Sequence, residues 1–247
     1  HYEGKLNLPW PCKFFLRSYK LKKIFSRDHL TAQDLTNQLE RKVEFLGNPF
    51  MDIFDQYEKK TNNSKINFSL LPGSRIPEIE ENFIIMLDLL ENLTNYKISN
   101  DFSFNFALVE SFSKKKVEKI LHMRNWRFKS NNGEVNNMIY RFKSINISLI
   151  WNSFENTLPR SDLVISMSGT AAEQAVGLGK PVIQIEGPGP QFTSSFADAQ
   201  RRLLGNYVFC ATKYKSKDEQ IQKTIEIIFK VIYLLKLDKN FLISCEK

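Results

Sequence analysis

The 25 residues from Ser161 to Ile185 (SDLVISMSGTAAEQAVGLGKPVIQI) limit the possible folds more than any other part of the chain. The short β-branched run Leu163–Ile165 predicts a strand, and the small residues Ser168–Thr170 predict a tight turn. A helix should follow and end at Gly179–Pro181, after which Val182–Ile185 predicts a second strand. This order is typical of a parallel α/β sheet.

The predicted turn has the chemistry of an anion site. Its side chains are small enough for a ligand to approach the backbone, and Thr170 is a suitable N-cap for the helix. A strand that leads into a helix in this way directs free N–H groups and the positive helix end at one point. We therefore expect a phosphorylated ligand here, with ordinary turn and cap chemistry as the alternative.

A second turn of this kind is expected earlier in the chain. Ile66–Leu71 predicts a strand that ends at Pro72–Arg75, and Pro77 suits the first turn of a following helix. The acidic residues of that first turn complement the helix dipole, and apolar residues then recur at helical spacing. These are Glu78, Glu80 and Glu81, and then Ile79, Phe83, Met86, Leu87 and Leu90.

Strands and helices continue to alternate through the rest of the chain. Further strands are predicted at 102–109, 145–151 and 207–210, with a helix at 113–123 and a long final helix bearing Ile221, Ile225, Ile228, Ile232 and Leu235 on one face. This alternation predicts an α/β, Rossmann-like parallel sheet with helices on both faces. Ligands of such sheets bind beyond the carboxyl ends of the strands, so we expect the two turns to converge on one ligand.

The amino-terminal region is basic and aromatic. In the stretch 10–27, Trp10 is followed by six basic and four interleaved aromatic side chains and no acid: Lys13, Arg17, Lys20, Lys22, Lys23 and Arg27, with Phe14, Phe15, Tyr19 and Phe25. We favour a solvated basic face over core aromatics, with an anionic membrane surface as the alternative. No nucleic-acid motif accompanies the stretch, so no nucleic-acid partner is expected. A short strand at 43–46, a helix at 50–60 and a linker at 61–65 should follow.

Composition narrows the class of protein. The three cysteines and three histidines are scattered, so we expect neither disulfides nor a metal site, and no cofactor is predicted. No apolar run approaches the ~18 residues of a membrane helix. We expect a cytoplasmic protein, and because the sequence has neither an initiator Met nor a signal peptide, a chain that starts within a longer protein.

Three segments together resemble lipid-A-disaccharide synthases. Residues 45–52 (FLGNPFMD) are similar to the family's FVGHPLxD, and residues 70–79 (LLPGSRIPEI) to its LLPGSRxxEI. Ser168–Ala172, followed by Lys180–Val182, is similar to SGTAxLE…P. The stretches at 187–192 and 196–200 bring the chain closest to a branch described as lipid-A-disaccharide synthase-related.

The resemblance implies the carboxy-terminal half of a GT-B glycosyltransferase. Residues 1–60 would be the tail of an amino-terminal acceptor domain with the hinge, 61–236 the UDP-sugar-binding domain, and 237–247 a tail. The enzyme would transfer an acylated glucosamine from a UDP-sugar donor to an acylated glucosamine 1-phosphate, a glycolipid acceptor of lipid A synthesis, and could sit peripherally at the inner face of the membrane. The implied donor-binding residues are Gly73, Ser74, Arg75, Ser168, Gly169, Thr170, Glu173, Gln174, Gly187, Gly189 and Gln191.

The sequence departs from the family at the ribose contact. The family's helix glutamate falls on Gln174, so Glu173 is expected to close a capping box with Thr170 and Gln174 to meet the ribose. The catalytic base would lie in the missing amino-terminal domain. Two other functions stay open: a UDP-N-acetylglucosamine 2-epimerase-like isomerase, whose SGGxQEE…SLGKP overlaps residues 173–181, and a non-catalytic UDP-sugar-binding remnant. A surface ion pair with Glu78 or Glu80 is the alternative role for Arg75.

Overall fold

The computed structural model describes residues 7–26, 28–54, 65–96, 101–131, 137–187, 193, 199–201, 203–237 and 241. The chain divides into two compact units, residues 1–55 and 56–247. Within the described parts, no helix combines the length and the apolar character that crossing a bilayer requires.

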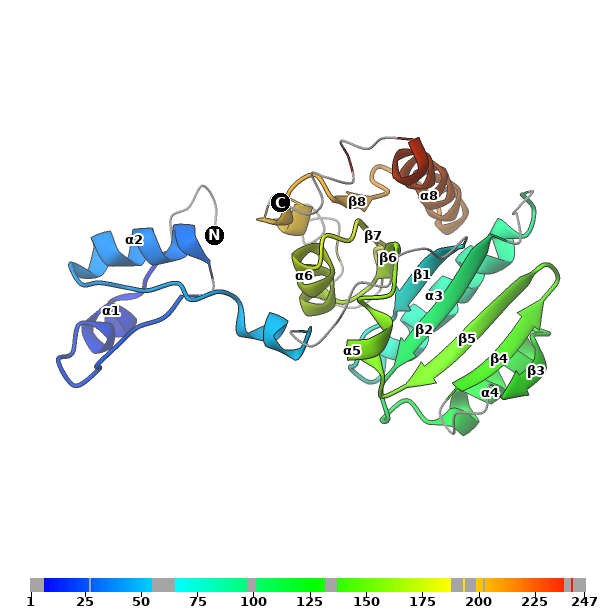
Figure 1. The fold of residues 1–247 in the computed structure, drawn as a ribbon, viewed down its shortest axis with the longest axis horizontal. Helices are drawn as coiled ribbons and strands as arrows, with labels where there is room; N and C mark the ends of the chain where they lie inside the picture. The colour runs from blue at the N-terminus through cyan, green and yellow to red at the C-terminus, as the bar shows by residue number, and fades with distance from the viewer. Residues whose placement is uncertain are drawn as a thin grey trace. The chain divides into compact units, whose positions relative to one another are not determined.

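The larger unit is built on an eight-stranded sheet with the order β3-β4-β5-β2-β1-β6-β7-β8. The strands are β1 (Ile66–Leu71), β2 (Phe102–Leu108), β3 (Arg127–Asn131), β4 (Asn137–Phe142), β5 (Ile145–Trp151), β6 (Leu163–Ser166), β7 (Val182–Gln184) and β8 (Val208–Cys210). The six strands from β5 to β8 in this order pair in parallel, whereas β3 and β4 add an antiparallel edge. In Figure 1 the strands β3 to β5 lie at one end of the sheet and β7 and β8 at the other. The parallel sheet was predicted from the sequence and the antiparallel edge was not.

Helices cover both faces of this sheet, as predicted. They are α3 (Glu78–Leu93), α4 (Lys114–Met123), α5 (Phe154–Thr157), α6 (Gly169–Gly177) and α8 (Lys217–Leu237). Side chains alternate between faces along a strand, and Phe68 and Leu70 of β1 share one buried core with Phe83 of α3 and Ile228 of α8. Ser69 lies between them, and its hydroxyl donates to the carbonyl oxygen of Thr157 in α5, at 3.4 Å. The helices α3 and α8 therefore cover one face, and α5 covers the other.

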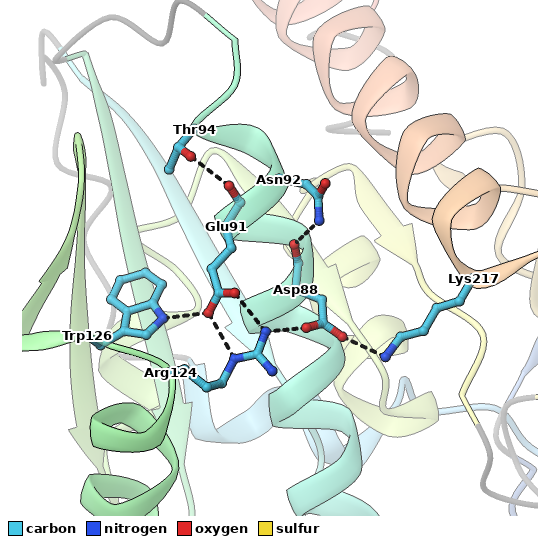
Figure 2. Close-up of polar contacts among 7 residues, drawn as sticks. All are labelled: Asp88, Glu91, Asn92, Thr94, Arg124, Trp126 and Lys217. Atoms are coloured by element: carbon cyan, nitrogen blue, oxygen red, sulfur yellow. Dashed lines mark hydrogen bonds and ion pairs between the residues drawn. The ribbon is translucent and has the colours of Figure 1, made fainter.

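A polar cluster ties α3 to the end of α4 and to α8 (Figure 2). The Arg124 guanidinium donates to both carboxylate oxygens of Glu91, at 2.9 and 2.7 Å, and also binds Asp88. Trp126 Nε1 donates to Glu91 at 2.8 Å, and Lys217 Nζ pairs with Asp88 at 2.6 Å. Partial burial lowers the pKa of Arg124, but the hydrogen bonds and charges of Glu91 and Asp88 outweigh burial and leave that pKa raised.

The smaller unit packs two helices over a short pairing of backbone segments. The helices are α1 (Trp10–Leu16) and α2 (His29–Leu39), and the pairing is one parallel bridge between Phe25 and Glu44. The predicted strand at 43–46 is therefore a single bridge residue. The predicted helix at 50–60 is a 3-10 helix, Pro49–Phe54, in its first part, and its remainder lies outside the described residues.

The aromatic residues of the basic stretch do not form a core. The exposed fraction is 78% for Trp10 and 85% for Tyr19, and Phe14, Phe15 and Phe25 are exposed as well. The core of this unit consists instead of Ile24, Ala32, Leu35, Leu39 and Val43. The favoured interpretation of core aromatics under a basic face is wrong, because α1 buries none of its own residues.

Candidate functional site

The candidate site lies where the order of the sheet reverses direction. From β1 the chain adds β2 and then β5 on one side, and it later returns to place β6, β7 and β8 on the other side. The carboxyl ends of β1 and β6 are neighbours, since Leu71 pairs with Ser166. Crevices at such switch points are where open α/β sheets bind ligands. Both predicted turns follow these two strand ends.

The two turns are in direct contact. Met167 N donates to the carbonyl oxygen of Leu71 at 2.9 Å, which ties the start of the second turn to the end of β1. Gly73 has a φ of +101°, and a Cβ atom on it would lie 3.5 Å from the Met167 carbonyl oxygen. The structure thus brings Gly73 and the Ser168 turn together, as the topology predicted. The left-handed backbone at Gly73 favours glycine.

The start of α6 differs from the prediction. Ser168, with extended φ and ψ, is the N-cap, and the helix begins at Gly169. Thr170 is therefore not the cap, and the capping box that it was expected to form with Glu173 is wrong. The Ser166 hydroxyl accepts from Ser168 N at 3.1 Å and lies 3.0 Å from the Ser168 carbonyl oxygen. These contacts place the N-cap at Ser168, two residues before the predicted N-cap Thr170.

The first turn of α6 presents unused donors. Ala172 N makes the first backbone hydrogen bond of the helix, to Ser168 O at 3.1 Å. Among the described residues, the N–H groups of Gly169, Thr170 and Ala171 have no hydrogen-bond acceptor. These donors and the helix dipole favour an anion at this end.

Arg75 is exposed and adds a positive charge to the turn after β1. Within the described ranges it forms no ion pair, and Glu80, its expected partner, pairs with Lys116 instead. The alternative role of Arg75 as partner of Glu78 or Glu80 is therefore not seen. Ser74, also exposed, precedes it.

The remaining predicted donor contacts differ in accessibility. Gln174 is only 6% exposed, whereas Glu173 is half-buried. Gly187 is described and lies at the end of β7, beside the two turns, but Gly189 and Gln191 lie outside the described residues. The ribose contact stays a prediction.

Sequence reasoning missed a polar group behind the end of β7. Gln184 Nε2 donates to Gln200 Oε1, and Tyr214 OH donates to Glu186 Oε2. Among the described residues, Gln184 Oε1 and Glu186 Oε1 are buried without a partner. Burial, and then the hydrogen bond and charge of Glu186, raise the pKa of Tyr214. A glutamine inside the apolar run of β7 was the sequence signal for this group.

No cluster of His, Cys, Asp and Glu in the described part of the chain could hold a metal ion. The positive groups of the two turns are instead a guanidinium and helix N–H donors. Such groups suit an anion with several oxygen atoms, for example a diphosphate.

No protein-family profile and no curated protein sequence matches this chain. Solved structures do. A Listeria monocytogenes protein described as a UDP-N-acetylglucosamine 2-epimerase has a TM-score of 0.57 and 14% identity, with coverage of 91% of this chain and 54% of that one. UDP-GlcNAc 2-epimerase from Neisseria meningitidis, solved with UDP-GlcNAc, has a TM-score of 0.55 and 16% identity, with coverage of 96% and 59%. This chain thus spans little more than half of either protein. The likeness establishes the fold: a mostly parallel eight-stranded sheet flanked by helices, which is part of a GT-B fold.

Proposed function

We propose that the two turns beyond the carboxyl ends of β1 and β6 bind the diphosphate of a UDP-sugar. The observation that carries this proposal is the contact between the Gly73 turn and the Met167–Ser168 turn at the switch point of the sheet. From this contact we expect the exposed Arg75 turn to lie near the free N–H groups of α6. The solved structure of the Neisseria protein with UDP-GlcNAc supports a nucleotide-sugar as the ligand class.

We further propose that the whole enzyme is a glycosyltransferase of the lipid-A-disaccharide synthase type. An acceptor hydroxyl would attack the anomeric carbon, and the bond from that carbon to the β-phosphate oxygen would break. The departing UDP gains negative charge, which a guanidinium and preorganised N–H donors stabilise. Arg75 and the start of α6 would supply these groups, and the base that takes the hydroxyl proton would lie outside residues 1–247.

The exposed aromatic residues of the smaller unit support a lipid-handling role. Trp10, Phe14 and Tyr19 are exposed next to Lys20 and Lys22, which are exposed as well. Aromatic side chains with adjacent cations are typical of surfaces that meet anionic lipid head groups. We propose that this surface approaches the membrane in which an acylated acceptor resides.

A second candidate is a UDP-N-acetylglucosamine 2-epimerase-like isomerase. Both solved structures described above carry that description, and the polar Glu173 and Gln174 overlap the epimerase motif. The two functions differ in their products. Proton NMR of UDP-GlcNAc incubated with the whole protein would show a C2 epimer for an isomerase, whereas a transferase given no acceptor would form no C2 epimer.

Donor selectivity tests the proposed binding. UDP at 100 times its dissociation constant should stabilise the chain by about 2.7 kcal/mol, which raises the melting temperature by roughly 5–11 °C for a unit of this size. ATP at the same concentration should give no such shift. Equal shifts with UDP and ATP, or no shift with either, would overturn the proposal.

Arg75→Ala isolates the contribution of the guanidinium. A hydrogen bond to a charged group is worth about 1.5–3 kcal/mol, so UDP affinity should fall roughly 10- to 150-fold. The melting temperature without ligand should stay the same, because Arg75 is exposed and forms no ion pair among the described residues. Arg160→Ala, which removes another exposed arginine, is the matched control and should leave the affinity unchanged.

A further inference from the structure

Asn82 is a buried polar residue on an otherwise apolar helix face. It lies in the second turn of α3, is 5% exposed, and is flanked by the fully buried Ile79, Phe83 and Met86. A buried amide in such a place lowers stability unless its hydrogen bonds are made. The hydrogen bonds and contacts of this amide therefore explain why an asparagine occupies this position.

One end of the Asn82 amide holds the turn after β1. Asn82 Nδ2 donates to the carbonyl oxygen of Pro72 at 2.8 Å. A Cβ atom on the next residue, Gly73, would lie 4.0 Å from the same nitrogen. The hydrogen bond thus fixes the backbone from which Ser74 and Arg75 project.

The other end of the amide meets the end of β7. A Cβ atom on Gly187 would lie 2.9 Å from Asn82 Oδ1 and 2.5 Å from Met167 Cε. Side chains do not normally approach this closely, so only glycine fits without movement of Asn82 or Met167. Asn82 therefore contacts the turn after β1 and Gly187, which lies three residues beyond β7. Met167, the residue that follows β6, contacts Gly187 as well.

We infer that Asn82 is a positioning residue of the diphosphate site. It holds the Arg75 turn in register with the ends of β6 and β7, so that the groups around the ligand are in place before the ligand binds. This role rests on the proposed binding of a UDP-sugar. A site whose donors are preorganised binds more tightly, because the ligand does not have to order them.

Two asparagines of α3 allow a matched comparison. Asn92 Nδ2 also donates to a carbonyl oxygen, that of Asp88, at 2.9 Å (Figure 2). It lies ten residues beyond Asn82 on α3, which is about 15 Å along an α-helix. Asn82→Ala should weaken UDP binding roughly 5- to 20-fold, the effect of a lost buried hydrogen bond. Asn92→Ala should leave the affinity unchanged. Equal affinities of the two variants would overturn the inference.

Asn82→Asp makes the pH dependence of UDP affinity a test of the positioning role, because a purely structural role of Asn82 would not change that dependence. An ionised carboxylate cannot donate to the Pro72 carbonyl, whereas a protonated carboxyl can. Burial raises the pKa of such a carboxyl, so the affinity of the variant relative to that of the parent should recover as the pH falls from about 8 to about 5. Protonation of UDP itself cancels in this ratio. A ratio that does not change with pH would overturn the inference.

The crowding at Gly187 provides a test of the mechanism. Gly187→Ala should displace Asn82 and weaken UDP binding by itself. It should cost less in the Asn82→Ala background, where Oδ1 is absent and the flexible end of the Met167 side chain has room to move away from the new methyl group. Additive losses would overturn the inference.

A readout without ligand separates this inference from the proposed function. The amide NMR resonances of Gly73 and Gly187 should both move in Asn82→Ala, and neither resonance should move in Asn92→Ala. If the parent chain binds no UDP, the proposed function is wrong, and these resonances still decide whether Asn82 holds the turns together. Unmoved resonances would overturn the positioning role.

Discussion

Replacing Arg124 by methionine would test how the larger unit anchors α3 to α4 and α8. The guanidinium bridges Glu91 and Asp88 of α3, and methionine keeps the apolar stem of the side chain without the charge. After the substitution Glu91 keeps its hydrogen bond from Trp126, and Asp88 keeps Lys217 (Figure 2). Neither carboxylate is left without a partner.

The expected loss in the free energy of unfolding lies between the values measured for buried and for exposed ion pairs. Removing one partner of a fully buried pair costs about 3–5 kcal/mol, whereas exposed pairs contribute about 0–1 kcal/mol. The side chains here are 25% exposed for Arg124, 17% for Asp88 and 20% for Glu91. Because each acid also retains a partner, we expect about 2 kcal/mol, which lowers the melting temperature by roughly 4–8 °C.

Thermal unfolding followed by circular dichroism at neutral pH measures this loss. Arg127→Met is the control, because Arg127 is exposed and forms no ion pair within the described residues. Added salt should reduce the difference in melting temperature between the parent and Arg124→Met only in part, since the ion pairs of Arg124 with Asp88 and Glu91 are mostly shielded from solvent. If Arg124→Met and Arg127→Met unfold at the same temperature, the cluster does not stabilise the unit and the reasoning is refuted.

Three further predictions follow from side-chain environments. The raised pKa of Tyr214 means that its contribution to the free energy of unfolding is full below about pH 10 and is lost as the pH rises above it. Tyr214→Phe should therefore flatten the decline of that free energy between about pH 9 and 11 in urea titrations, and an unchanged decline would contradict this prediction. Trp10→Ala should reduce co-sedimentation with vesicles of anionic lipid, and the parent should not sediment with neutral vesicles; equal sedimentation of parent and variant would exclude the proposed surface. Because Gln174 is buried and is the residue expected to meet the ribose, Gln174→Ala should lower both the melting temperature and the UDP affinity more than Glu173→Ala does; calorimetric titration showing the larger loss of affinity for Glu173→Ala would contradict this assignment.

Two strands of the sheet, β1 and β5, could be predicted from the sequence to the residue, whereas β2, which lies between them, ends one residue before the predicted 102–109. β1 and β5 begin and end where predicted, because each is an apolar run between residues that favour turns. β3 and β4 were missed because an edge hairpin is half exposed, and its residues Arg127–Asn131 and Asn137–Phe142 show no clear apolar period. The helix α2 was also missed, although Asp28, whose Oδ1 accepts from Thr31 N at 2.7 Å, was a usable capping signal.

The candidate site was predictable in its turns but not in the contacts that support them. Ser168 and Thr170 are both good N-caps, and only the hydrogen bond of the Ser166 hydroxyl to Ser168 decides between them. Asn82 could not be singled out, since its partner Pro72 is ten residues away and Gly187 more than a hundred. Local patterns predict strand ends well, whereas side chains that join several strand ends depend on the tertiary packing.

The close contact at Gly187 has a consequence for related sequences. The space between Asn82 Oδ1 and Met167 Cε leaves no room for a side chain at Gly187, so these three positions share one fixed volume. A homologue with a larger residue in place of Gly187 should carry a smaller one in place of Asn82 or Met167. Substitutions at these three positions, which are far apart along the chain, should therefore be correlated among homologous sequences.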